Sequence, residues 1–160
     1  MRGQSHFTKD RSVYWPGEFS DVVNTLTGKN IQGVSVGNPL YQFNTGAIAF
    51  AASVGLKHRR KREVGSDRKE ITTGTFASHR LEMYIFLIAM LGMDSPNVDL
   101  LRAEHEDAVI REFERYAAGG LEYLRTEFEQ NPTQSPDVVL EKMFREELKV
   151  DPSDTELPDL

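Results

Sequence analysis

A short run of cationic side chains is the first feature of this sequence that could do chemistry. Residues 57–62 read Lys-His-Arg-Arg-Lys-Arg, and two more cations follow at residues 68 and 69. Residues 57–69 carry a charge of +5 in a chain whose net charge is −6, which leaves −11 for all other residues. Such a local excess of cations indicates a partner that carries phosphate. The candidate nucleic-acid-binding residues are Lys57, His58, Arg59, Arg60, Lys61, Arg62, Arg68 and Lys69.

The same charges also have a purely structural explanation. A solvated basic loop can balance the acidic remainder of the chain, or of a second copy of it. Residues 101–160 contain sixteen acids and seven Lys or Arg, a net charge of −9, so the two halves of the protein are polarised. The run also starts where a predicted helix ends, and the helix dipole favours cations at that end. Both interpretations stay open at this point.

Candidate catalytic and metal-binding groups are sparse. His79 and Glu82 are one helical turn apart, and His105 has an acid on either side, but a zinc site needs three or four ligands. Asp67 and Glu70 are the only carboxylates beside the basic run that suggest a metal-dependent nuclease. The sequence contains no cysteine, no glycine-rich phosphate loop and no nucleophile elbow. We therefore expect no catalytic residue, no metal and no cofactor, and an accessory protein rather than an enzyme.

Helical periodicity predicts the elements that position the basic run. An apolar stripe indicates a helix over residues 19–26, preceded by Trp15 as an aromatic anchor and ended by Gly28 in the left-handed conformation. A helix rich in small residues is predicted over residues 45–56, with Thr45 as its N-cap and Gly55 as its left-handed C-cap. The basic run would begin on the chain that leaves this helix. Residues 63–75 are expected to form a loop or hairpin with a β-like piece near residues 71–73.

Two later helices are predicted to build the core. Residues 80–91 are apolar almost all round, so this helix is expected in the centre, and its nine-residue apolar run is too short to span a membrane. A long helix is predicted from about residues 98–104 to residue 128. Its apolar phase continues through Gly119 and Gly120, which would cost roughly 2 kcal/mol in a helix interior. Either a partner helix crosses closely there, or the helix is bent, or it breaks and a new helix begins at Gly120.

The fold class that follows is mainly α. We expect a single compact helical domain of about five helices over residues 13–150, with a basic loop or short hairpin. The last helix is predicted over residues 137–149, after Ser135 and a Pro at its first position. Residues 1–12 are expected to be frayed, and residues 151–160, with two Pro and four acids, are expected to form a disordered acidic tail. The lack of cysteine and of a signal peptide suits the cytoplasm.

Two segments of the chain resemble a known family. These are Phe-Ala-Ala-Ser-Val-Gly-Leu at residues 50–56 and Phe-Glu-Arg-Tyr-Ala-Ala-Gly-Gly-Leu-Glu-Tyr-Leu at residues 113–124. They are similar to the patterns of DNA phosphorothioation-associated protein 4, also called dnd system-associated protein 4, and the resemblance runs from about Asp10 to Phe128. It implies a bacterial cytoplasmic accessory protein of a DNA-modification and phage-defence gene cluster. It implies no catalytic residues.

The sequence and the resemblance together lead to one main functional hypothesis. We expect a non-catalytic adaptor that touches DNA phosphates through the basic run, without reading bases. The main alternative is a purely protein-binding subunit of a larger defence complex, and a metal-dependent nuclease is a weaker one. The expected partners are DNA, other proteins of the gene cluster, or both, and no membrane. The oligomeric state is left open, including a homo-oligomer.

Overall fold

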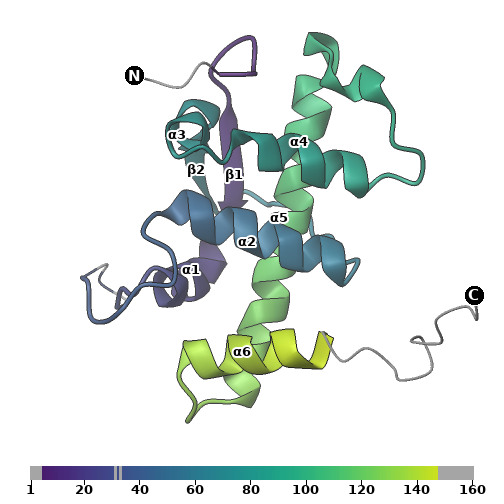
Figure 1. The fold of residues 1–160 in the computed structure, drawn as a ribbon. Helices are drawn as coiled ribbons and strands as arrows, with labels where there is room; N and C mark the ends of the chain where they lie inside the picture. Colours follow the sequence, from purple (N-terminus) through teal and green to yellow (C-terminus); the bar gives the residue numbers. More distant parts are fainter. Residues whose placement is uncertain (1–4, 31, 33, 148–160) are drawn as a thin grey trace, which may run out of the picture. The chain divides into compact units, whose positions relative to one another are not determined.

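The structure, a computed structural model, describes residues 5–30, 32 and 34–147. Within them the chain forms six α-helices and one small two-stranded sheet, so the predicted mainly α fold is confirmed (Figure 1). The chain divides into two parts, residues 1–126 and residues 127–160, and each is described by itself. The acidic tail expected at residues 151–160 lies outside the described residues.

The sheet joins two segments that are far apart in the sequence. Strand β1 (Ser12–Pro16) runs antiparallel to β2 (Arg68–Thr72), with Val13 opposite Ile71 and Trp15 opposite Lys69. Val13 and Trp15 are buried and the residue between them is not, which is the alternation that a strand imposes. Strand β2 covers most of the β-like piece expected near residues 71–73, but β1 was not predicted. Trp15 is buried just before a short 3-10 turn (Gly17–Phe19) and helix α1 (Ser20–Leu26), as an anchor at a helix start should be.

Helix α2 (Asn44–Lys57) confirms the predicted helix of small residues, but its two ends differ from the prediction. Thr45 is not the N-cap, because its hydroxyl lies 2.7 Å from Nδ1 of His79 instead. Gly55 is not the C-cap either, because it lies inside the helix. The left-handed residue after α2 is Arg59, with φ at 54°. The predicted left-handed Gly28 after α1 is confirmed, with φ at 67°.

Helix α4 (Glu82–Leu91) follows the short helix α3 (Thr73–Ser78) and differs from its predicted burial. Its inner face is buried, but Met83, Tyr84, Leu87 and Leu91 are 46–59% exposed. The prediction that this helix is enclosed in the centre is therefore wrong for the side that carries these four residues. Among the described residues, no helix is long and apolar enough to cross a membrane.

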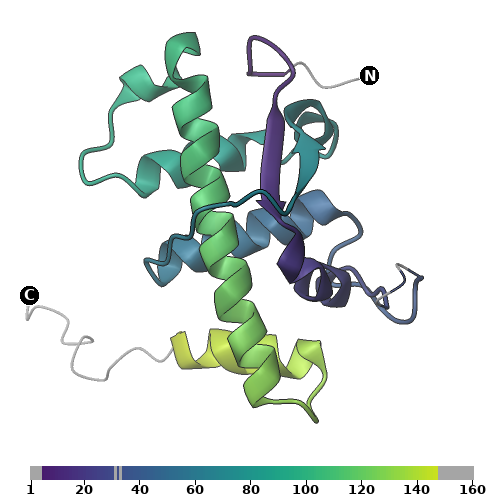
Figure 2. The same ribbon diagram turned by 180° about the vertical axis from the view of Figure 1, so that it is seen from behind.

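Helix α5 (Glu106–Gln130) passes through Gly119 and Gly120 without a break, so the alternative of a new helix at Gly120 is wrong. Two 3-10 turns (Val98–Leu101 and Ala103–His105) precede it, so α5 begins slightly later than predicted. Helix α2 crosses α5 at the glycines, as both ribbon views show (Figures 1 and 2). A Cβ on Gly120 would lie 1.6 Å from the carbonyl oxygen of Ala51. The predicted close crossing of a partner helix is thus confirmed.

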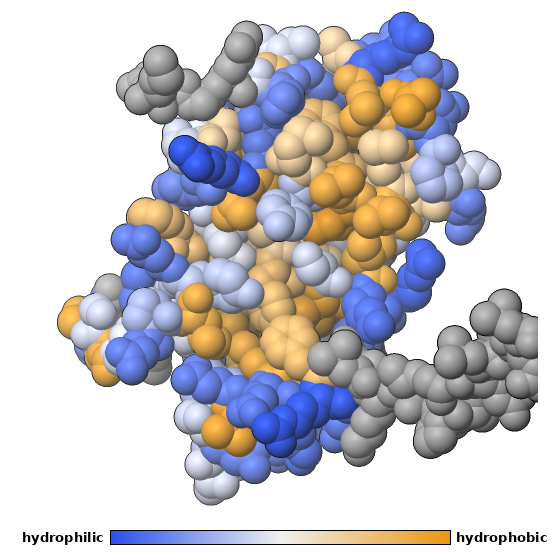
Figure 3. All heavy atoms as spheres, viewed as in Figure 1, coloured by the Kyte–Doolittle hydropathy of each residue, from blue (hydrophilic) through white to orange (hydrophobic). Residues whose placement is uncertain are grey.

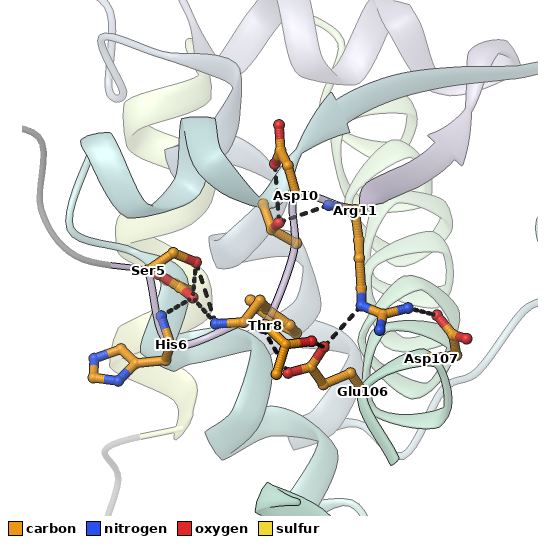
Figure 4. Close-up of polar contacts among 10 residues, drawn as sticks. Ser5, His6, Thr8, Asp10, Arg11, Glu106 and Asp107 are labelled. Atoms are coloured by element: carbon orange, nitrogen blue, oxygen red, sulfur yellow. Dashed lines mark hydrogen bonds and ion pairs between the residues drawn. The ribbon is translucent and has the colours of Figure 1, made fainter. Parts of the chain in front are cut away.

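Two buried carboxylates hold the segment that precedes β1. Oε1 of Glu82 accepts hydrogen bonds from the hydroxyl of Ser5 and from the backbone N–H groups of residues 6 and 7, at 2.6–3.0 Å. Glu106 accepts bonds from the backbone and hydroxyl of Thr8, both at 2.9 Å, and from Nε of Arg11 at 2.8 Å (Figure 4). Residues 5–11 belong to the stretch expected to be frayed, and here they are tied to α4 and α5. Residues 1–4 lie outside the described residues.

The second part of the chain contains the end of α5 and helix α6 (Pro136–Glu147). Helix α6 begins with Pro at its first position, as predicted, and the N–H of Val139 donates to the carbonyl oxygen of Ser135 at 3.1 Å. Val139, Leu140 and Met143 are buried. Their spacings of one, three and four residues place them on one side of the helix, and the expected extension to residue 149 lies outside the described residues.

Candidate nucleic-acid interface

Residues 57–69, which we call the basic segment, leave the end of α2, cross α5 and enter β2. Figure 2 shows this crossing, with the segment lying over α5. The backbone N–H of Arg62 donates to the carbonyl oxygen of Arg115 on α5 at 3.0 Å. A Cβ on Gly119 would lie 2.2 Å from the carbonyl oxygen of Arg60, so only glycine lets the segment lie this close to the helix. The segment is therefore a fixed part of the fold at its middle.

Lys61 and Arg62 are neutralised by acids of the same chain. Nζ of Lys61 lies 2.7 Å from Oε2 of Glu112. Arg62 forms ion pairs with Glu18, at 2.6 Å, and with Glu122. Its guanidinium also lies 5.0 Å from the ring centre of Phe19. These two side chains fasten the basic segment to α5.

Protonation states at Lys61 and Glu112 agree with this role. The hydrogen bond to Glu112 raises the pKa of Lys61, so the ammonium stays charged. Burial alone would raise the pKa of Glu112, but the hydrogen bonds from Lys61 and Arg115 outweigh it and lower that pKa. The carboxylate and the ammonium thus hold each other in the ionised form.

His58 and Arg60 lie against one aromatic side chain of α5. The ring of His58 stacks on Tyr123 with 4.0 Å between ring centres, and the guanidinium of Arg60 lies 5.3 Å from the same ring centre. The imidazole of His58 is half-buried, whereas Arg60 is exposed. A stacked cation keeps its charge while its position is restricted.

Arg68 and Lys69 are exposed on β2 and lie over aromatic rings of β1. The distances to the ring centres are 3.9 Å for Arg68 over Tyr14 and 5.5 Å for Lys69 over Trp15. Glu114 interacts electrostatically with Arg68, and its carboxylate accepts a hydrogen bond from the N–H of Tyr14 at 2.6 Å. Burial raises the pKa of Glu114, and the charge of Arg68 opposes that shift. Arg68 is therefore only partly balanced.

Lys57 and Arg59 are exposed and form no ion pair within the part of the chain that the structure describes. The eight predicted residues thus fall into three groups. Two are paired with acids, His58 is stacked, and five cations have no ion-pair partner among the described residues: Lys57, Arg59, Arg60, Arg68 and Lys69.

The acidic partners were missed because they come from other elements. Helical spacing alone would pair the acids of α5 with arginines of the same helix, and one such pair exists, Arg115 with Glu112 at 2.6 Å. Glu112 and Glu122, however, also serve the basic segment, and Arg125 pairs with Asp21 of α1 at 2.9 Å. Glu112 and Glu122 are ten residues apart on α5, and no sequence pattern indicates that both pair with the segment that crosses this helix.

The weak metal hypotheses gain no support from the structure. Among residues 5–30, 32 and 34–147, no group of three or more His, Asp or Glu lies close enough to hold a metal ion. Asp67 and Glu70 are both exposed, and Glu70 accepts a hydrogen bond from Ser12 at 2.5 Å. Nδ1 of His79 is engaged with Thr45, and Glu82 with residues 5–7. The side chains of Glu70, His79 and Glu82 thus have structural partners within the chain.

Comparison with models of known families gives a match for this chain. The family model described as DNA sulphur modification system-associated protein 4 matches residues 15–160. Neither the curated proteins nor the solved structures give a match. The matched range contains the basic segment, the crossing of α2 and α5, and all six α-helices. The match covers most of the sequence and agrees with the resemblance noted at residues 50–56 and 113–124, so this chain belongs to the DNA sulphur modification system-associated protein 4 family.

Proposed function

We propose that this protein is an accessory subunit of a bacterial DNA sulphur modification and anti-phage defence system, and that it contacts DNA phosphates. The contact uses the unpaired cations of the basic segment, with Lys57, Arg59 and Arg60 at its start and Arg68 and Lys69 at its end. The supporting observation is that the cations of the segment fall into two groups, one paired with acids and one exposed. Lys61 and Arg62 fasten its middle to α5, and the remaining cations face solvent without acid partners in the described part of the chain.

The backbone at Arg59 supports a role for that side chain. Its φ of 54° lies in the left-handed region, which costs an L-residue roughly 1–2 kcal/mol and which glycine adopts freely. This left-handed residue closes the end of α2, because the N–H of Arg59 donates to the carbonyl oxygen of Leu56 at 3.2 Å and the N–H of Arg60 donates to that of Gly55 at 2.8 Å. Glycine is the usual residue at such a position, and the two bonds do not use the arginine side chain, so the presence of arginine there is what supports a role for it.

The expected binding mode is electrostatic and blind to sequence. Five cations on one short segment reach about two to four phosphates, and each contributes about −0.9 to the slope of log K against log salt. Tripling the salt concentration should then weaken binding roughly 7- to 50-fold. Replacing a phosphate oxygen by sulphur keeps the phosphate charge, so modified and unmodified duplexes should bind about equally well.

Fluorescence anisotropy with a labelled DNA duplex, between about 50 and 150 mM salt, tests this proposal. The variant changes Lys57, Arg59 and Arg60 to Ser, and a matched control changes Arg102, Lys142 and Arg145 to Ser. We expect the first variant to lose most binding and to show a flatter salt dependence, and the control to keep the slope of the parent. Circular dichroism checks that both keep the helical fold. The proposal fails if the parent does not bind at low salt, or if the first variant binds as the parent does.

A purely protein-binding subunit is the second candidate. The observation that favours it is the pairing of Lys61 and Arg62 with acids of the same chain, because it shows that part of the basic segment serves charge balance. In that case the five other cations would meet an acidic protein surface. Absence of DNA binding, with capture of a gene-cluster protein that the first variant loses, would support this candidate.

A further inference from the structure

The outer face of α4 is apolar although it faces solvent. Met83, Tyr84, Leu87 and Leu91 are 46, 47, 48 and 59% exposed, and at 3.6 residues per turn they fall within an arc of about 100°. We call these four residues the α4 stripe. Figure 3 shows apolar side chains gathered over this region of the surface. Val98 and Leu101, which follow α4 in the chain, are 72 and 49% exposed.

A helix that is apolar on all sides is normally enclosed. The inner face of α4 is covered within the chain, where Ile85, Phe86 and Ile88 are buried. The stripe with Val98 and Leu101 exposes on the order of 600 Å², at the upper limit for an ordinary monomer surface. Each partner in a standard protein interface buries about 800 Å². This face therefore has the apolar chemistry of an interface and about three quarters of the area of one side of a standard one.

The arrangement of the stripe is symmetric about one residue. Leu87 lies midway between Met83 and Leu91, and it also lies midway between Arg80 and Asp94, which flank the helix. In an antiparallel pair of α4 helices with the two-fold axis at Leu87, each Met83 meets a Leu91 of the other copy. The segment with Arg80 then lies at the same end of the helix pair as the segment with Asp94 of the other copy, because both flank α4 at equal sequence distances from Leu87. An isologous interface requires this kind of self-complementary surface.

The charged residues at the two ends of α4, Arg80 and Asp94, are compatible with this arrangement. Arg80 and Asp94 are exposed, and neither forms an ion pair within the described residues. The φ of 60° at Arg80 belongs to the end of α3, where the N–H of Arg80 donates to the carbonyl oxygen of Ala77 at 3.0 Å and the N–H of Leu81 donates to that of Phe76 at 2.9 Å. Opposite charges that meet at an interface fix its register and orientation.

We propose that the α4 stripe is the interface of a symmetric homodimer in which two α4 helices pack antiparallel about Leu87. A membrane surface fits less well, because such helices carry many Lys and Arg beside the apolar face, whereas here Arg80 is accompanied by two acids, Asp94 and Asp99. The dimer does not depend on whether the basic segment contacts DNA.

Sedimentation velocity from about 1 to 200 μM tests the dimer, because a homodimer near the micromolar range changes mass with concentration over that interval. We expect the parent to dimerise, and Leu87→Asp to weaken the dimer by at least about 100-fold, because the residue occurs twice at the axis. The matched control is Val36→Asp, at a residue that is 66% exposed and lies outside the stripe. Circular dichroism confirms folding of each variant. A parent that stays monomeric throughout, or a dimer that Leu87→Asp leaves intact, overturns the proposal.

A charge exchange tests the antiparallel register. Arg80→Asp places two carboxylates at each end of the interface, and Asp94→Arg places two cations there. Each single change should weaken the dimer about tenfold, and the double exchange should restore it. Failure of the double exchange to restore the dimer refutes the antiparallel arrangement. Binding of the parent to neutral phospholipid vesicles as a monomer, lost in Leu87→Asp, assigns the stripe to a membrane and overturns the dimer.

Discussion

The crossing of α2 and α5 allows the sharpest prediction about stability. A Cβ on Gly120 would lie 1.6 Å from the carbonyl oxygen of Ala51 and 2.9 Å from the backbone nitrogen of Gly55. Both are backbone atoms of α2, so no side-chain rotation relieves the clash and the helices must separate. Conversely, a Cβ on Gly55 would lie 2.0 Å from the carbonyl oxygen of Tyr116. The close approach is therefore reciprocal, and it lies amid buried side chains such as Ile48 and Leu121.

Replacing Gly120 by Ala has two opposing effects on the free energy of unfolding. Ala stabilises a helix interior by about 1 kcal/mol relative to Gly. Overpacking typically costs 1–3 kcal/mol and more when backbone must move, and an ordinary C···O contact needs a separation increased by well over 1 Å here. We take the cost as about 3–5 kcal/mol, which gives a net destabilisation of about 2–4 kcal/mol.

Urea denaturation followed by circular dichroism measures this difference. Gly65→Ala is the matched control, because a Cβ on Gly65 meets no atom within 4 Å and its φ is not in the left-handed region. That variant should be neutral or more stable by about 0.4–1 kcal/mol, because Ala restricts the unfolded chain. If Gly120→Ala is as stable as the parent, the two helices do not cross at this distance and the reasoning is refuted.

Three further predictions concern the basic segment and its acidic partners. Arg59→Gly should raise stability by about 1 kcal/mol in thermal unfolding while it weakens DNA binding, and a loss of stability would contradict the cost assigned to its backbone. Arg62→Ala should lower stability by about 1–2 kcal/mol at low salt and by less at high salt, because two partly exposed ion pairs and the contact with Phe19 are lost. At pH 7, Glu112→Gln should destabilise by about 1 kcal/mol and Glu114→Gln should be neutral or stabilising. The pKa of Glu112 is lowered from 4.5, so its contribution is present above that pH and is lost as the pH falls through the lowered value. The pKa of Glu114 is raised, so the protein loses stability as the pH rises through the raised value and this carboxylate ionises. Equal effects of the two changes on stability would refute this assignment.

Local patterns in the sequence predicted α1, α2, α4, α5 and α6, but not the short helix α3. The apolar phase from Ile110 to Phe128 specified one continuous helix in spite of two glycines, and the need for a close partner followed from their cost. Gly55 has the same role from the other helix, yet the sequence suggested a C-cap because a glycine near a helix end commonly has that role. Only the position of Tyr116 in space distinguishes the two roles.

Features that depend on distant pairing were not predictable in the same way. Strand β1 exists because β2 lies beside it, and a five-residue strand has little signal of its own. In the sequence, Glu82 and Glu106 stood out only as weak candidate metal ligands beside His79 and His105, but each is almost fully buried and satisfied by backbone and side-chain donors of residues 5–11. A sequence pattern cannot show that an acid finds its donors about 75 or more residues away.

The basic run was the strongest signal in the sequence, and its charges turn out to do two different things. Counting charges treats Lys61 and Arg62 as equal to Arg59, but the first two are balanced within 3 Å by acids and the third is not. A variant that removed all of them together would lose the fastening of the segment along with its free charge, so weaker DNA binding would not separate the two causes.

Arg59 and Arg80 offer a cleaner separation, because both are exposed arginines at positive φ without ion pairs in the described part of the chain. Arg59 belongs to the proposed DNA contact and Arg80 to the proposed dimer. Changing each to Gly removes one charge and relieves one unfavourable backbone conformation, so any loss of binding or of dimerisation cannot come from a weakened fold.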